Sequence, residues 1–175
     1  MDQYLIQEKS AASAQSLRGK GNIQFSLKNY ASSVKLYTDS ILCCPSDDTN
    51  EMSIAYANRS ASLFQLELYE DCIADIDIAI NHRYPAHLLP KILIRKMKSL
   101  NILRKTEDLK TVFVELDSAM KNLQLTEMKT SKMITLISKI FPFMCQYYFQ
   151  RNCNQKSKVC STDAQICAKD PTRKM

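Results

Sequence analysis

One stretch near the middle of the sequence, Tyr56–Ile80, constrains the fold more than any other. Its first part is rich in small residues, and its second part carries apolar side chains at steps of three and four residues, as at Cys72, Ile73 and Ile76. That spacing predicts two helices joined by a turn at Tyr69, with one apolar stripe on the second helix. A helix pair of this kind cannot bury its stripe alone. The sequence therefore predicts neighbouring pairs of the same kind.

Similar patterns lie upstream and downstream of this stretch. Asn22 precedes a turn at Tyr30 and a helix stopped by Pro45, and Arg95 lies in a third helical pattern. The spacing of matching positions (58 − 22 = 36 and 95 − 58 = 37, counted through Asn58) is close to the 34 residues of a helix-turn-helix repeat. The sequence predicts an all-α solenoid of about three repeats with a C-terminal helical extension. The predicted repeats are 14–47, 53–86 and 90–125, within a domain of residues 14–125.

Composition agrees with long helices. The 175 residues include only two glycines and five prolines, and this scarcity of helix breakers argues against a sheet protein rich in turns. The net charge is +6, but residues 1–125 hold fifteen basic and fifteen acidic side chains, so the excess lies in residues 126–175. A neutral repeat region argues against a nucleic-acid partner.

The C-terminal part divides into two predicted segments. Residues 126–150 contain the apolar run Met133–Phe149 and are predicted to form a capping helix. Lys139, Pro142 and the short length of that run argue against a membrane span. Residues 151–175 are basic and poor in apolar side chains, which predicts disorder. Four cysteines in this part could suggest zinc, but their spacing lacks a C-x₂-C pair and no metal site is expected. They are Cys145, Cys153, Cys160 and Cys167.

Several of these residues resemble the tetratricopeptide repeat (TPR). The first repeat carries Gly21-Asn22, Tyr30, Tyr37 and Pro45, and the second carries Asn58-Arg59-Ser60-Ala61, Tyr69, Ala79 and Pro85. The runs Tyr56–Ala61 and Tyr69–Cys72, followed by Tyr84-Pro85 and Arg95-Lys96, are similar to a narrower group. That group is the TPR-bearing branch of the SET- and MYND-domain protein-lysine methyltransferases. The resemblance implies a TPR domain that precedes a catalytic part.

The TPR resemblance also implies a binding site. The first helices of TPR pairs line a concave groove, and the chaperone-binding type grips two neighbouring carboxylates with five residues of the types Lys, Asn, Asn, Lys and Arg. The matching residues here are Arg18, Asn22, Asn58, Lys91 and Arg95. The implied ligand is the acidic, EEVD-like C-terminus of cytosolic heat-shock chaperones. The first match replaces Lys by Arg, which keeps the charge but changes its geometry.

A second interpretation of these five residues stays open. The two asparagines could bond between repeats, and the basic residues could be solvated surface charges, in which case the groove binds something else or nothing.

The sequence does not indicate an enzyme in this chain. Asn81-His82 is followed by Arg83-Tyr84-Pro85 without the cysteine of a SET segment, and the two glycines, Gly19 and Gly21, lie in a helix. No cofactor and no catalytic residues are expected. The alternative is that the chain is a part or short form of a SET/MYND methyltransferase whose catalytic part is absent from it.

The beginning of the sequence predicts the compartment. Met1-Asp2-Gln3-Tyr4 has neither the basic start nor the apolar run of a secretion signal, and the seven cysteines are expected to be reduced. We therefore expect the protein in the cytoplasm, with the nucleus as a second compartment. We also expect a monomer.

Overall fold

The computed structural model describes residues 10–45 and 49–123. They belong to one compact unit, Met1–Leu125, and a second unit comprises Thr126–Met175. The predicted capping helix at 126–150 and the predicted basic tail at 151–175 lie outside the described residues.

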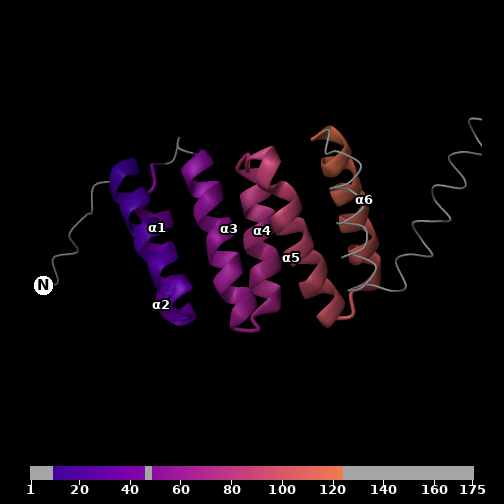
Figure 1. The fold of residues 1–175 in the computed structure, drawn as a ribbon, viewed down its shortest axis with the longest axis horizontal. Helices are drawn as coiled ribbons and strands as arrows, with labels where there is room; N and C mark the ends of the chain where they lie inside the picture. The colour runs from indigo at the N-terminus through magenta and orange to yellow at the C-terminus, as the bar shows by residue number, and fades with distance from the viewer. Residues whose placement is uncertain (1–9, 46–48, 124–175) are drawn as a thin grey trace, which may run out of the picture. The chain divides into compact units, whose positions relative to one another are not determined.

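Helices account for the regular structure of the described part of the chain, which contains no strand (Figure 1). They are α1 (Ala11–Ser26), α2 (Tyr30–Cys43), α3 (Thr49–Gln65), α4 (Tyr69–Asn81), the short 3₁₀ helix η1 (Ala86–Leu88), α5 (Leu89–Ile102) and α6 (Thr106–Asn122). We call α1, α3 and α5 the A helices, and α2, α4 and α6 the B helices. The prediction of an all-α fold is confirmed for this part.

Each A helix packs against the B helix that follows it. The pairs α1–α2, α3–α4 and α5–α6 are joined to one another by contacts of α2 with α3 and of α4 with α5. Contacts of α1 with α3, and of α3 with α5, place the A helices next to one another in one layer. Figure 1 shows α3, α4, α5 and α6 side by side in chain order.

The turn within each pair has the same backbone conformation. Lys28, Glu67 and Arg104 all have positive φ, of 62°, 62° and 57°. In each case the next residue donates its backbone N–H to a carbonyl five residues earlier, from Asn29 to Gln24, Leu68 to Leu63 and Lys105 to Leu100. This is the Schellman motif that ends a helix. The three positions are 39 and 37 residues apart (67 − 28 and 104 − 67), so they give the register for comparing repeats.

The first pair is held together by a close approach at Gly21. A Cβ atom there would lie 2.5 Å from the ring of Tyr37, which is itself only 2% exposed. Glycine therefore lets the α2 tyrosine lie directly on the α1 backbone. In the second pair, Cys72 and Ile76 are fully buried. Both belong to the hydrophobic core, as the apolar stripe predicted on the second helix of this stretch requires.

Some helix ends differ from the sequence prediction. α1 begins at Ala11 rather than Ala14, and α3 begins at Thr49, four residues before the predicted start at Ser53. Glu51 lies in the first turn of α3, where the helix dipole favours an acidic side chain. α5 begins one residue before Pro90, so this proline lies in the first turn, where its missing N–H would have no partner within the helix.

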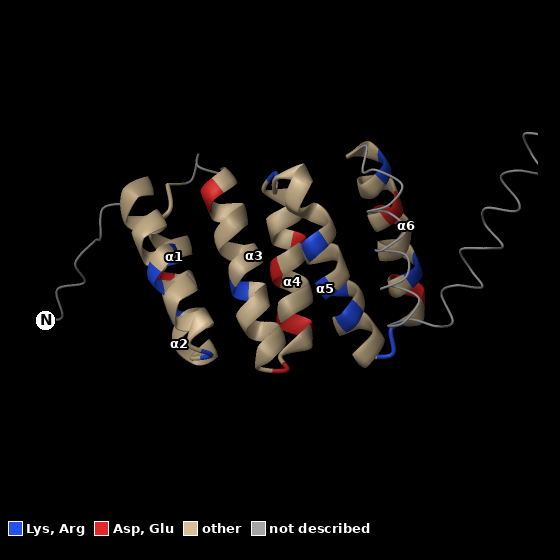
Figure 2. Ribbon diagram, in the orientation of Figure 1, with Lys and Arg blue, Asp and Glu red and all other residues tan. Residues whose placement is uncertain are grey.

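The A and B helices carry opposite charge. The A helices contain seven Lys or Arg and one acidic residue, a net of +6 (7 − 1). The B helices contain three Lys and nine Asp or Glu, a net of −6 (3 − 9). Figure 2 shows the contrast between α4, which carries red segments, and α5, which carries blue ones. The neutral repeat region is therefore polarised between its two sets of helices.

Candidate functional site

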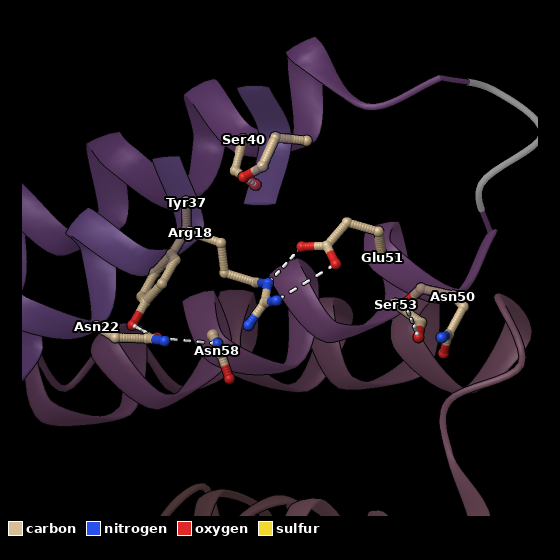
Figure 3. A network of polar contacts seen from close by, with 9 residues as sticks. Arg18, Asn22, Tyr37, Ser40, Asn50, Glu51, Ser53 and Asn58 are labelled. Carbon is tan, nitrogen blue, oxygen red and sulfur yellow. Dashed lines mark hydrogen bonds and ion pairs between the residues drawn. The ribbon is translucent and has the colours of Figure 1, made fainter. Parts of the chain in front are cut away.

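Two of the five predicted site residues contact each other directly. Asn58 on α3 donates from Nδ2 to the Oδ1 of Asn22 on α1, at 3.1 Å. The hydroxyl of Tyr37 on α2 donates to the same oxygen at 2.9 Å (Figure 3). Two donors thus fix the Asn22 carboxamide, and its Nδ2 hydrogens have no acceptor among the described residues. The exposed Asn22 presents a preorientated donor on the A-helix layer.

The tyrosine in this network has a pKa that is shifted by its surroundings. Burial raises the pKa of Tyr37 to about 12, and the nearby charge of Arg18 opposes part of that shift. The phenol is therefore protonated at neutral pH and remains a donor to Asn22.

Arg18 is engaged by a carboxylate of the chain itself. Its guanidinium forms an ion pair with Glu51, with one contact through Nε and a second from Nη2 to Oε2 at 3.3 Å (Figure 3). The two side chains are only 18% and 13% exposed. Arg18 therefore already has a carboxylate partner within the chain.

The two basic residues of α5 differ from each other. Lys91 is exposed, one turn before Arg95 on the same helix. Arg95 is half-buried and donates from Nη1 to the backbone carbonyl of Ala57 at 2.9 Å and to Ser60 Oγ at 2.7 Å. Burial lowers the pKa of the Arg95 guanidinium, because it removes the charged group from water. Arg95 remains charged at neutral pH.

The repeat register relates three of these positions. Asn58 and Arg95 each lie nine residues before the positive-φ residue of their pair (67 − 58 and 104 − 95), and Gly19 has this place in the first pair (28 − 19). A Cβ atom at Gly19 would meet nothing within 4 Å. The same repeat position of the A helices is thus occupied by Gly19 in α1, Asn58 in α3 and Arg95 in α5.

Sequence reasoning missed three groups around the site: the Glu51 carboxylate, the Ser60 hydroxyl and the Ala57 carbonyl. One signal could have found the first, because Glu51 is the sole acidic residue of the three A helices. The role of the five predicted residues in binding a carboxylate stays a prediction.

Neither metal nor membrane features mark the described residues. They contain no cluster of three or more His, Cys, Asp or Glu that could hold a metal ion. No helix within them combines the length and the hydrophobicity that a membrane span requires. The four cysteines considered for zinc lie outside these residues.

Comparison with solved structures identifies the fold. The first TPR of Spaghetti (RPAP3), solved with the HSP90 peptide SRMEEVD, matches with a TM-score of 0.57 and 20% identity, over 77% of this chain and 96% of that one. The N-terminal domain of stress-induced protein-1 (STI-1) from C. elegans matches with a TM-score of 0.55 and 16% identity, over 74% and 95%. The chain has a TPR-like helical fold, and the predicted solenoid is confirmed.

Comparison of sequences gives more specific relatives, although no protein-family model matches the chain. It is 39% identical over 100 residues to the protein-lysine N-methyltransferase SMYD4 of Danio rerio and 37% identical over 100 residues to that of Homo sapiens. These matches cover 57% of this chain but only 13% and 12% of the two methyltransferases. The mitochondrial import receptor subunit TOM70 of Rattus norvegicus is 29% identical over 96 residues, 54% of this chain and 15% of the receptor. The predicted resemblance to protein-lysine methyltransferases is confirmed over this stretch.

Proposed function

We propose that the A-helix layer of this chain binds the C-terminal end of an acidic peptide, of the EEVD-like kind found on cytosolic heat-shock chaperones. The residues that make contact are Arg18, Asn22, Asn58, Lys91 and Arg95. The chain is then a non-catalytic protein-interaction module.

The orientation of Asn22 is the observation that carries this proposal. Its oxygen is already satisfied by Tyr37 and Asn58, so it offers hydrogen-bond donors, and a carboxylate is purely an acceptor. Because the amide is held in place before a ligand arrives, little conformational entropy is lost on binding. The A helices carry a net charge of +6, of which Arg59 and Lys96 are paired with acids of α4. The remaining positive charge attracts an anionic peptide to the same layer.

Similarity of fold adds support. The RPAP3 repeat domain, whose fold this chain shares, was solved with the HSP90 peptide SRMEEVD. Hydrogen bonds to charged groups contribute about 1.5 to 3 kcal/mol each. After the costs of ordering, a few such bonds correspond to a dissociation constant of about 1 μM.

The experiment is a calorimetric titration of residues 1–125 with SRMEEVD, once as the free acid and once as the C-terminal amide. We expect the amide to bind about tenfold more weakly, because one carboxylate is lost. We expect Lys91→Ala and Asn58→Ala to weaken the free acid by a similar factor. Lys98→Ala is the matched control, since it removes the same charge from the same helix outside the site. Equal affinity for acid and amide would refute the proposal.

A second candidate function follows from the match to SMYD4. Here the described helices are the protein-binding part of a longer protein-lysine methyltransferase, and the activity belongs to residues that this chain lacks. An antibody raised against residues 49–81 tests this on cell extracts. A reactive protein far larger than 20.0 kDa, with SET-type peptides in its mass spectrum, is the expected result. Fractionation of the same extracts tests the proposed location in the cytoplasm and nucleus.

A further inference from the structure

One acidic residue stands among the basic side chains of the A helices. Glu51, in the first turn of α3, is set against seven Lys and Arg on α1, α3 and α5. Its carboxylate pairs with Arg18 through two contacts, and the pair is largely shielded from water. The cation at the α1 end of the proposed site, Arg18, is thus already bound by a carboxylate of the chain itself.

The α5 end of the same site has no such counter-charge. Arg95 contacts only neutral acceptors, the Ala57 carbonyl and the Ser60 hydroxyl, among the described residues. Lys91 is exposed one turn away. The positive charge available to an incoming anion is therefore concentrated on α5, and the Arg18 end is electrically balanced by Glu51.

We propose that Glu51 is a specificity-determining residue that mimics a ligand carboxylate at Arg18. A peptide anchors its terminal carboxylates on Asn22, Asn58, Lys91 and Arg95. Its contact with Arg18 forms only when a further acidic group displaces Glu51. The inference deepens the proposed peptide binding and rests on it.

The position of Glu51 makes displacement feasible. Near the N-terminus of α3 its carboxylate is stabilised by the helix dipole as well as by Arg18. When a ligand carboxylate binds Arg18, the displaced Glu51 carboxylate is still stabilised by the helix dipole. Glu51 therefore weakens the binding of an acidic group at Arg18 without preventing it.

The experiment compares wild type with Glu51→Gln in titrations with free-acid SRMEEVD. We expect Glu51→Gln to bind about three- to tenfold more tightly, because Arg18 is released and a like charge is removed. Arg18→Ala should change wild-type affinity less than about twofold, yet abolish the gain when combined with Glu51→Gln. Glu115→Gln, an exposed acid on α6, controls for the change in net charge.

Circular dichroism verifies that each variant is folded. If Glu51→Gln does not fold, Glu51→Asp replaces it, since the shorter side chain withdraws the carboxylate from Arg18 and should give a smaller gain. Unchanged or weaker binding by a folded Glu51 variant would overturn the inference and leave the proposed peptide binding intact. If wild type and variant both bind acid and amide equally, the proposed function fails and the inference fails with it.

Discussion

The second and third helix pairs place a basic residue at the same repeat position of their A helices, but the two residues are paired differently. Arg59 and Lys96 each lie eight residues before the positive-φ residue of their pair (67 − 59 and 104 − 96). Each lines a groove between neighbouring B helices, of about 400 Å³ for Arg59 and 320 Å³ for Lys96. The environments are alike, so the difference lies in the partners.

Arg59 is tied mainly to its own pair. It makes two hydrogen bonds to Asp75 on α4, at 2.8 and 2.7 Å, and a third to Thr38 on α2 at 3.0 Å. Asp75 is 5% exposed at its side chain. The bond to Asp75 raises the pKa of the Arg59 guanidinium. Its planar fork matches the carboxylate, as a lysine could not.

Lys96 is tied to the preceding pair instead. The position equivalent to Asp75 is Val112, eight residues after the turn residue in each case (75 − 67 and 112 − 104), and it is buried. Lys96 therefore bonds to Asp77 on α4, whose side chain is 46% exposed. Asp77 is the repeat equivalent of Thr38 (77 − 67 and 38 − 28).

The same repeat position therefore has two structural roles. A buried acid in the following B helix turns the A-helix cation into a link within the pair. Where valine replaces that acid, as at Val112, the A-helix cation bonds to the preceding helix pair instead, as Lys96 does. The Arg59–Asp75 pair is buried and has two hydrogen bonds, whereas the Lys96–Asp77 pair has one and includes a half-exposed carboxylate. The contributions of the two pairs to the free energy of unfolding should therefore differ several-fold.

The largest expected effect comes from Arg59→Ala. It leaves the buried Asp75 carboxylate without its partner, and we expect the free energy of unfolding to fall by about 3 to 5 kcal/mol. Urea unfolding monitored by circular dichroism measures this. The double variant Arg59→Met with Asp75→Leu should recover most of the loss, because the uncompensated charge is gone. A loss below about 1 kcal/mol in Arg59→Ala would contradict the buried pairing.

An intermediate effect is expected from Val112→Asp, which copies the second pair into the third. A buried carboxylate is costly, and Lys96 cannot bind it in a fork, so we expect a loss of about 2 to 3 kcal/mol. Adding Lys96→Arg should restore more than about 1 kcal/mol. The double-mutant cycle by urea unfolding isolates this coupling. If the free-energy changes of Val112→Asp and Lys96→Arg simply add, the two positions do not interact.

The smallest effect is expected from Lys96→Ala. Because Asp77 is half exposed, losing the pair should cost less than about 1 kcal/mol. The difference from wild type should shrink further between about 50 and 500 mM salt, since the pair is screened. Lys98→Ala, on the same helix, is the matched control. A loss as large as that of Arg59→Ala would remove the contrast between the two pairs.

The sequence allowed the helices and their repeat to be predicted, because apolar periodicity and spacing are properties of the chain itself. It placed Tyr30 and Tyr69 at turns, and each begins a B helix. It could not predict the A-helix start at Thr49, because the dipole-favoured Glu51 lies outside the apolar pattern. The side-chain partners that join different helices also could not be predicted from the sequence. The rotamers of Arg18 and Arg95 depend on Glu51, Ala57 and Ser60, which only the packed structure brings near.

The separation of charge between A and B helices has a consequence for encounters in solution. Equal and opposite charges on two layers give the unit a transverse dipole moment, so an approaching polyanion exerts a torque as well as an attraction. Helix axes in contact are about 8 to 10 Å apart, which is comparable to the screening length of about 8 Å at physiological ionic strength. The torque therefore acts only over the last nanometre, where it turns the basic layer toward the polyanion just before they touch.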